Sequence, residues 1–96
     1  MVLSILSNGN VFVQPIHELL SRIRWDPNFG QGEFVIGVYD RVEKEIVLLP
    51  LKSIQMFSGE HHVFHYMDEE GEEHRVPFHR IKAVYKNGQL IWHREQ

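Results

Sequence analysis

The chain has 96 residues, of which 43% are hydrophobic and 24% are charged. This length and balance fit one globular domain over residues 1–96 and exclude a disordered or fibrous protein. The absence of cysteine excludes disulfides, thiolate metal sites and cysteine nucleophiles. The net charge of −3 argues against binding duplex nucleic acid through bulk positive charge, although it leaves room for a small basic site.

Residues 1–13 are apolar but interrupted. The polar run Ser7-Asn8-Gly9-Asn10 divides them, no basic region precedes them, and the stretch is too short to cross a membrane. Asn8-Gly9 between two apolar runs predicts a hairpin turn, with a flexible N-terminal arm as the alternative. Nothing here indicates secretion, so we expect a cytoplasmic protein without a membrane partner.

A short helix is predicted after Pro15, because proline suits the first helical position. Apolar residues then recur at helical spacing: Ile16, Leu19, Leu20 and Ile23. The pair Asp26-Pro27 ends the helix, since the residue before a proline avoids the helical region. A helix of about ten residues is too short to be stable alone, so we expect it to pack on a sheet.

The rest of the chain has the pattern of strands joined by short turns. Apolar residues alternate over residues 33–42, so that Phe34, Ile36 and Val38 share one face. Further strands are expected over residues 46–49, 61–67, 72–76, 83–86 and 90–94, and residues 51–57 are ambiguous. The sequence Asn87-Gly88, a strong hairpin signal, joins the last two strands.

These connections are of hairpin length, which disfavours parallel βαβ units. We therefore expect an α+β fold. One N-terminal helix would pack on a curved, mostly antiparallel sheet, or on a small partly closed barrel, of about five to six strands.

Seven histidines raise the question of a metal or acid–base site. On a strand over residues 61–67, His61 and His65 would share one face but lie roughly 13 Å apart, too far to share one ion. His61 and His62 would point to opposite faces. Metal-binding His/Glu or Cys/His spacings are absent. We therefore expect solvent-facing histidines, with neither a metal site nor another cofactor.

The acidic run Asp68-Glu69-Glu70-Gly71-Glu72-Glu73 predicts a solvated hairpin tip rather than a carboxylate pair for acid–base catalysis. Its five acidic residues account for more than the whole net charge of −3, since without them the chain would carry +2. An anion site elsewhere on the chain is therefore electrostatically reasonable.

Arg22 and Arg24 end the predicted helix next to Trp25. Arginines in a last helical turn complement the helix dipole, and Trp25 is expected to be partly buried in the core. The alternative is that a guanidinium and the indole grip a phosphate and stack a base.

Residues 77–81, Pro-Phe-His-Arg-Ile, form the most unusual segment. The proline fixes the entry, and Phe78 and Ile81, three apart, are both expected to face the core. His79 and Arg80 then lie on the open side. There a planar fork of guanidinium donors and an imidazole would form a phosphate clamp.

Arg41 follows Asp40 at the end of the first long strand. An ion pair between two such surface residues contributes little to stability. Arg41 gains interest only if the fold brings it beside His79 and Arg80. The alternative for His79 and Arg80 is structural, with both bound to backbone groups and to Asp26 or Asp40.

Taken together, four motifs resemble a known family. In chain order they are Arg24-Trp25-Asp26-Pro27, Tyr39-Asp40-Arg41, Val76-Pro77-Phe78-His79-Arg80-Ile81 and Leu90-Ile91-Trp92. Their order and spacing resemble the RNA cyclic group end recognition domain, a family of small archaeal and bacterial proteins. The resemblance covers residues 15–94, and the Pro-x-His-Arg-Ile segment is its most diagnostic part.

The resemblance implies a non-catalytic module that recognises single-stranded RNA termini, with 2′,3′-cyclic phosphate ends, in RNA repair or processing. It also implies a partner such as an RNA end-processing phosphoesterase or nucleotidyltransferase. The matching positions are Arg24, Trp25, Arg41, His79 and Arg80. A terminal cyclic phosphate carries one charge, so a few donors suit it better than a long basic groove.

Two other functions remain open. A small phosphoesterase or RNA-processing enzyme would use His79 as acid or base and would need a second acid–base group, taken from the other histidines. A protein-interaction module would use an exposed sheet edge. Convergence of Arg41, His79 and Arg80 on one cleft would favour RNA-end binding or catalysis over protein interaction.

Overall fold

The computed structural model describes residues 14–94, so the hairpin or arm expected around Asn8-Gly9 lies outside the described residues. In chain order the elements are α1 (Ile16–Trp25), β1 (Phe34–Asp40), β2 (Glu45–Pro50), the 3₁₀ turn η2 (Leu51–Ser53), β3 (Ile54–Gln55), β4 (Val63–Met67), β5 (Glu73–Pro77), the 3₁₀ turn η3 (Phe78–Arg80), β6 (Ile81–Lys86) and β7 (Gln89–His93). In this part of the chain no helix has both the length and the apolar character needed to span a bilayer.

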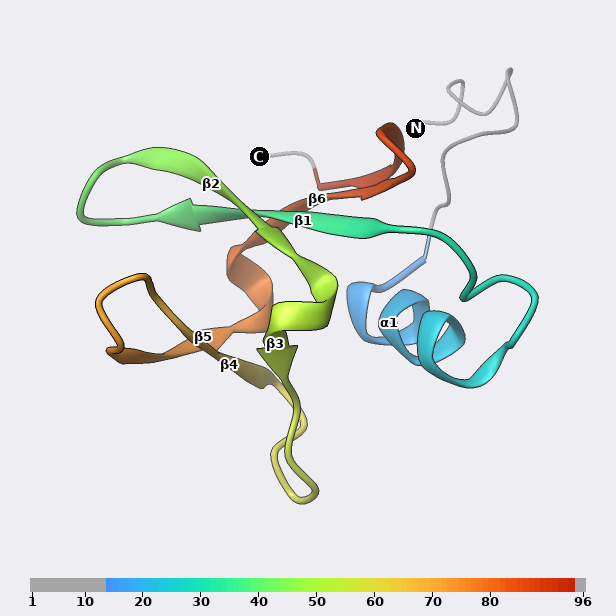
Figure 1. The fold of residues 1–96 in the computed structure, drawn as a ribbon, viewed down its shortest axis with the longest axis horizontal. Helices are drawn as coiled ribbons and strands as arrows, with labels where there is room; N and C mark the ends of the chain where they lie inside the picture. Colours follow the sequence, from blue (N-terminus) through green and yellow to red (C-terminus); the bar gives the residue numbers. More distant parts are fainter. Residues whose placement is uncertain (1–13, 95–96) are drawn as a thin grey trace.

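The strands form two antiparallel sheets, which confirms the α+β class. The four-stranded sheet has the order β2-β1-β6-β7 and the three-stranded sheet the order β3-β4-β5. The two 3₁₀ turns connect them, η2 between β2 and β3 and η3 between β5 and β6 (Figure 1). The number of described strands exceeds the expected five to six because the ambiguous residues 51–57 contain β3. The described strands do not close into a barrel.

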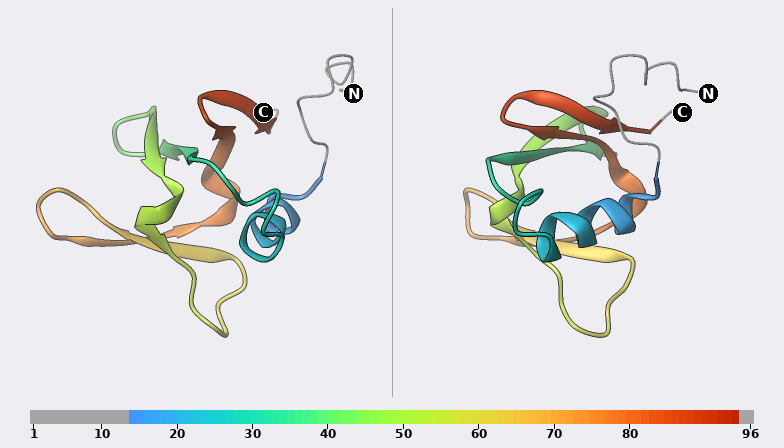
Figure 2. Two further views of the ribbon diagram at one scale, coloured as in Figure 1. Left: turned by 45° about the vertical axis from the view of Figure 1, so that its right-hand side comes forward. Right: turned by 90° about the vertical axis from the view of Figure 1, so that its right-hand side faces the viewer.

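The core lies between the two sheets and α1, which covers one open side of the space between them (Figure 2). Phe34, Ile36 and Val38 are all buried, which confirms the predicted inner face of β1. Leu19 of α1 is completely buried, as is Phe64 of β4. Burying side chains of this size contributes roughly 1.5–3 kcal/mol each, which is what stabilises a ten-residue helix that is too short to form alone.

The predicted Asn87-Gly88 hairpin is present. Asn87 has φ 51° and Gly88 φ 84°, the left-handed values that a two-residue turn between β6 and β7 requires. Asn87 also binds the start of β1: its side-chain oxygen accepts the Glu33 N–H at 2.9 Å, and its own N–H donates to the Glu33 carbonyl at 2.7 Å. The hairpin is therefore fixed against the strand next to it in the sheet.

The strand predicted over residues 61–67 begins only at Val63, so the prediction that His61 and His62 occupy a strand is wrong. Both lie in a bend that follows the turn around Gly59, whose φ of +91° reverses the chain. Their ring centroids are 6.4 Å apart. These histidines belong to the loop of residues 56–62 that leads from β3 to β4.

Candidate functional site

The turn η3 presents His79 and Arg80 as the sequence predicts. Phe78 and Ile81, at the two ends of the turn, are 9% and 0% exposed, so apolar anchors three residues apart hold it to the core. His79 is exposed and Arg80 is half-buried. Because the backbone of the turn is fixed at both ends, the two polar side chains start from a defined position.

Arg94, at the end of β7, holds η3 from the side. Its Nε donates to the carbonyl oxygen of Ile81 at 3.1 Å, and its Nη2 donates to that of Phe78 at 3.4 Å. The Phe78 carbonyl also accepts the Ile81 N–H, so Arg94 adds a charged donor to the end of the turn. Sequence reasoning missed this residue because no local pattern connects it with carbonyls 13 and 16 residues earlier.

The structural alternative for His79 and Arg80 is not observed. The side chains of Asp26 and Asp40 each accept two backbone N–H groups of the turn that follows, at 2.8–3.1 Å. The N–H of Phe29 is the largest cause that lowers the pKa of Asp26, and the N–H of Asn28 lowers it further. Within residues 14–94, neither His79 nor Arg80 forms a side-chain hydrogen bond or an ion pair.

The two arginines at the end of α1 have different surroundings. Arg22 Nε lies 3.8 Å from Asp26 Oδ2, and its guanidinium carbon lies 4.1 Å from the ring centroid of Phe29. Arg22 therefore helps to fix the loop that follows the helix. Arg24 is exposed, with its guanidinium 5.6 Å from the Trp25 ring, and remains accessible to a ligand.

Trp25 is 74% exposed, so the expectation that it is partly buried in the core is wrong. The reason is its place on the helix. Residue 25 is five positions after Leu20, which rotates it by about 140° from that buried side chain. An uncovered indole next to a free guanidinium fits the alternative in which the pair contacts a ligand.

Arg24 and Trp25 line an open groove of about 520 Å³ between α1 and the loop of residues 56–62. The helix contributes His17, Leu20, Ser21, Arg24 and Trp25; the loop contributes Met56, Phe57, Ser58, Gly59, Glu60, His61 and His62; and η3 contributes Phe78. Sequence reasoning missed His17, Phe57, His61 and His62 as candidates because only the tertiary fold places the loop opposite the helix.

Arg41 lies elsewhere. It is the exposed first residue of the β1–β2 turn, and in Figure 1 this turn lies at the opposite end of the molecule from α1. Val38 pairs with Ile81 in an antiparallel register, so the residues of β1 after Val38 run past η3, and Arg41 follows them in the turn. The groove is not lined by Arg41, His79 or Arg80. The structure thus brings Arg24 and Trp25 together next to η3 but leaves Arg41 outside the groove.

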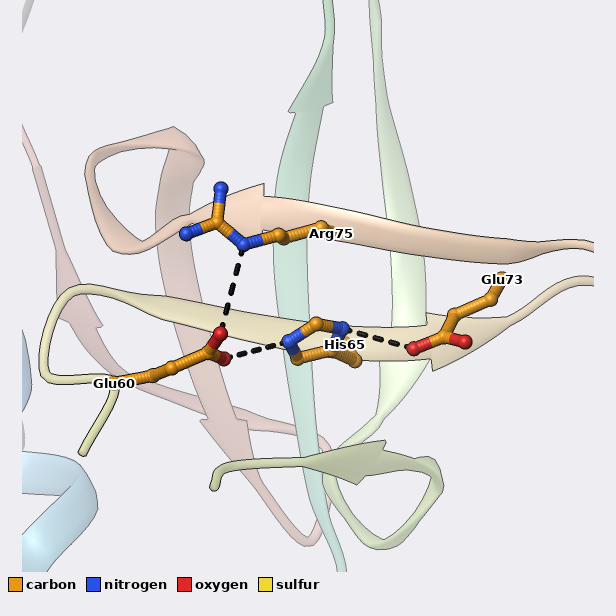
Figure 3. A network of polar contacts seen from close by, with 4 residues as sticks. All are labelled: Glu60, His65, Glu73 and Arg75. Atoms are coloured by element: carbon orange, nitrogen blue, oxygen red, sulfur yellow. Dashed lines mark hydrogen bonds and ion pairs between the residues drawn. The ribbon is translucent and has the colours of Figure 1, made fainter. Parts of the chain in front are cut away.

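His65 is not solvent-facing, contrary to expectation, since its side chain is only 13% exposed. Its Nε2 lies 2.7 Å from Glu60 Oε1 and its Nδ1 lies 3.0 Å from Glu73 Oε2, while Arg75 Nε lies 3.8 Å from the other oxygen of Glu60 (Figure 3). The network holds the loop of residues 56–62 to β4 and β5 and counters the charge of Glu60.

A second histidine–carboxylate pair lies at the β4–β5 hairpin. His74 Nε2 lies 2.8 Å from Asp68 Oδ2, and this bond, followed by the N–H of Glu72, lowers the pKa of the Asp68 carboxyl. One ligand atom from each of Asp68, Glu72 and His74 lies within 4.8 Å of the others, which is close enough for a shared cation. The internal hydrogen bonds already account for this arrangement.

A comparison with known protein families matches residues 13–94 to the MJ1316 RNA cyclic group end recognition domain. The chain belongs to this family. The match confirms the resemblance seen in the sequence, and it includes the groove as well as η3. The family name describes recognition of cyclic groups at RNA ends, which supports an RNA end-binding role for this domain and describes recognition rather than catalysis. No curated protein and no solved structure matches the chain.

Proposed function

We propose that the domain binds single-stranded RNA termini carrying a 2′,3′-cyclic phosphate, in RNA repair or processing, and that it catalyses no reaction itself. The observation that carries this proposal is the presentation of two polar side chains on η3. His79 and Arg80 project from a turn anchored by two core residues, and within residues 14–94 they have no polar partner. Membership of a family named for recognition of RNA cyclic ends supplies the ligand class.

The chemistry of a cyclic phosphate suits these two side chains. It carries a single negative charge and has no free 2′ or 3′ hydroxyl, so its oxygens only accept hydrogen bonds. Arg80 supplies a planar fork of donors and His79 supplies one more. Since only an end has to be bound, an overall acidic protein can carry out this recognition.

The other candidate residues have supporting roles in this proposal. Arg24 and Trp25, in the groove next to η3, contact the RNA chain. Arg41, exposed in the turn that follows β1, makes a further phosphate contact of smaller effect. An RNA end-processing phosphoesterase or nucleotidyltransferase would act on the end that the domain presents.

The surroundings of His65 and His74 favour binding over the alternative of a phosphoesterase or RNA-processing enzyme that uses His79 as acid or base. Opening a cyclic phosphate by acid–base catalysis needs a second proton-transfer group close to the first. His65 and His74 are bonded to carboxylates, and no hydrogen bond within residues 14–94 joins His79 to another histidine.

The test compares matched short RNAs that end in a cyclic phosphate, a 3′-phosphate or a hydroxyl, titrated at several salt concentrations and followed over time for product. We expect the cyclic end to bind most tightly. Arg80→Ala should weaken that binding by about 1.5–3 kcal/mol, since it removes charge-assisted hydrogen bonds. Lys52→Ala is the charge-matched control, because Lys52 is an exposed cation on η2, outside η3 and the groove.

Three outcomes would contradict the proposal. Equal affinity for the three ends would remove end recognition. Absence of binding to all three would favour the protein-interaction alternative. Conversion of the cyclic end to a product, lost in His79→Ala, would make the domain an enzyme.

A further inference from the structure

The groove between α1 and the loop of residues 56–62 has the features of a second nucleotide subsite. We infer that it binds the base and the phosphate of the nucleotide that precedes the RNA end, with His17, Phe57, His61 and His62 joining Arg24 and Trp25 in contacting it. This inference rests on the proposed function for the position of the end itself, at η3. The groove subsite would bind any single-stranded RNA, whatever the chemistry of its terminus.

Aromatic surface is available in the groove. Trp25 is 74% exposed and Phe57 is 46% exposed, from the helix and from the loop respectively. Every base has a flat π-face, so stacking on an uncovered ring binds single strands with little sequence preference. The indole, more exposed than the phenyl ring, is the main stacking surface.

The charge of the groove fits a phosphodiester. Arg24 and three histidines line it, and its acidic lining residue is Glu60. Glu60 is held by His65 at 2.7 Å and lies 3.8 Å from Arg75, so its charge is countered by residues outside the lining (Figure 3). Because the Arg24 guanidinium lies 5.6 Å from the Trp25 ring, a base on the ring would have its own phosphate near the cation.

The groove is continuous with η3. Phe78 lines the groove, and its backbone N–H donates a 2.7 Å hydrogen bond to the carbonyl oxygen of His62. The next residue along the chain is His79, whose Cα lies only about 3.8 Å farther on. An RNA strand whose terminal phosphate meets His79 and Arg80 therefore has the groove within reach of its preceding nucleotide.

The loop side of the groove is fixed before any ligand binds. The Glu60 N–H donates to the Phe57 carbonyl at 3.0 Å, the Glu60 side chain is bonded to His65, and the His62 carbonyl is bonded to Phe78. A preorganised wall of this kind loses less conformational entropy on binding than a free loop.

The experiment measures how affinity depends on RNA length. The probes are a nucleoside 2′,3′-cyclic phosphate and a dinucleotide and a tetranucleotide with the same cyclic end. The wild-type domain should bind the dinucleotide five- to a hundred-fold more tightly than the mononucleotide, in line with one stacked base. Trp25→Ala and the double variant His61→Gln/His62→Gln should lose most of this gain, and Trp25→Phe should retain much of it.

Separate readouts distinguish this inference from the proposed function. The groove variants should keep the preference for a cyclic over a hydroxyl end, because η3 is unchanged. Arg80→Ala should show the reverse pattern, losing the end preference but keeping the gain with length. Met67→Ala, which truncates another exposed apolar side chain outside the groove, is the matched control and should change neither.

The groove subsite is overturned if the affinity of the wild type does not rise with RNA length. It is also overturned if the rise is unchanged in Trp25→Ala and His61→Gln/His62→Gln. Either result leaves end recognition in place. The wild-type domain could instead show no end preference but bind longer RNA more tightly, with the groove variants losing that gain in affinity. This result would retain the groove as an RNA site and overturn the proposed function. An acidic peptide that binds the groove while RNA does not would overturn the groove inference. The side chains replaced in the groove variants and in Met67→Ala are exposed, so far-UV circular dichroism of these variants should be unchanged.

Discussion

Arg94 Nε donates a 3.1 Å hydrogen bond to the carbonyl oxygen of Ile81, a residue 13 positions earlier in the chain. The same guanidinium reaches the carbonyl oxygen of Phe78 at 3.4 Å, so one side chain from the end of the last strand spans the whole of η3. Arg94 is therefore a positioning residue: it fixes the backbone from which His79 and Arg80 project.

Arg94→Ala should lower the free energy of unfolding by about 1–2 kcal/mol, since it removes two hydrogen bonds from a partly buried cation. It should also reduce the preference for a cyclic RNA end, because the turn is no longer held in one geometry. Arg94→Lys should restore little, as an ammonium does not have the planar fork that reaches both carbonyls. Urea unfolding and RNA titration measure the two effects.

Arg41→Ala is the matched control for Arg94. The side chain is exposed and forms no hydrogen bond or ion pair within residues 14–94. Its loss should change the free energy of unfolding by less than about 0.5 kcal/mol. Equal destabilisation by the two arginine variants would contradict the role given to Arg94.

Trp92 and Trp25 should respond differently to the same substitution. Trp92 is 4% exposed, and its indole N–H donates a 2.7 Å hydrogen bond to the carbonyl oxygen of Gln14, just before α1. Trp92→Phe should cost about 1–2 kcal/mol of stability, because it removes the donor and leaves that carbonyl without it. Trp25→Phe, at an exposed position, should cost less than about 0.5 kcal/mol. Thermal or urea unfolding of the two variants checks the difference.

His65→Ala should destabilise the domain by about 1–3 kcal/mol. It removes two bonds to carboxylates and the edge-on contact with Phe57, whose ring centroid lies 4.8 Å away. His61→Ala is the control, as His61 is exposed and should have little effect on unfolding. If both variants unfold at the wild-type urea concentration, the network of Figure 3 contributes nothing to stability.

Asp68 should make stability depend on pH in the acidic range. The bond from His74 and the backbone N–H groups lower the pKa of the folded-state carboxyl below its usual 3.8. The stabilisation is then fully present above pH 3.8 and is lost as the pH falls through the lowered pKa. Asp68→Asn should therefore unfold more easily than wild type at pH 7, with a difference that shrinks below pH 3.8.

Unfolding curves recorded at several pH values test this prediction, and NMR titration of the Asp68 carboxyl tests its cause. His74→Gln should move the pKa of Asp68 back toward its usual value, since the largest cause of the shift is removed. A difference between wild type and Asp68→Asn that stays constant with pH would contradict the argument.

The sequence by itself predicted the features that depend on neighbours along the chain. Helical spacing after Pro15, alternation over β1 and the left-handed preference of Asn87-Gly88 are local properties, and each is present in the structure. The three-residue spacing of Phe78 and Ile81 is local too, so the outward placement of His79 and Arg80 was predictable.

The tertiary structure alone decided which of these segments meet. The groove exists because the loop of residues 56–62 packs opposite α1, and Arg94 holds a turn whose carbonyls are 13 and 16 residues away; neither relationship leaves a pattern in the sequence. The same holds for the exposure of Trp25, the burial of His65 and the distance of Arg41 from the groove. Contacts of this kind follow from how two sheets and a helix share one core, whereas composition and periodicity report only what each segment prefers locally.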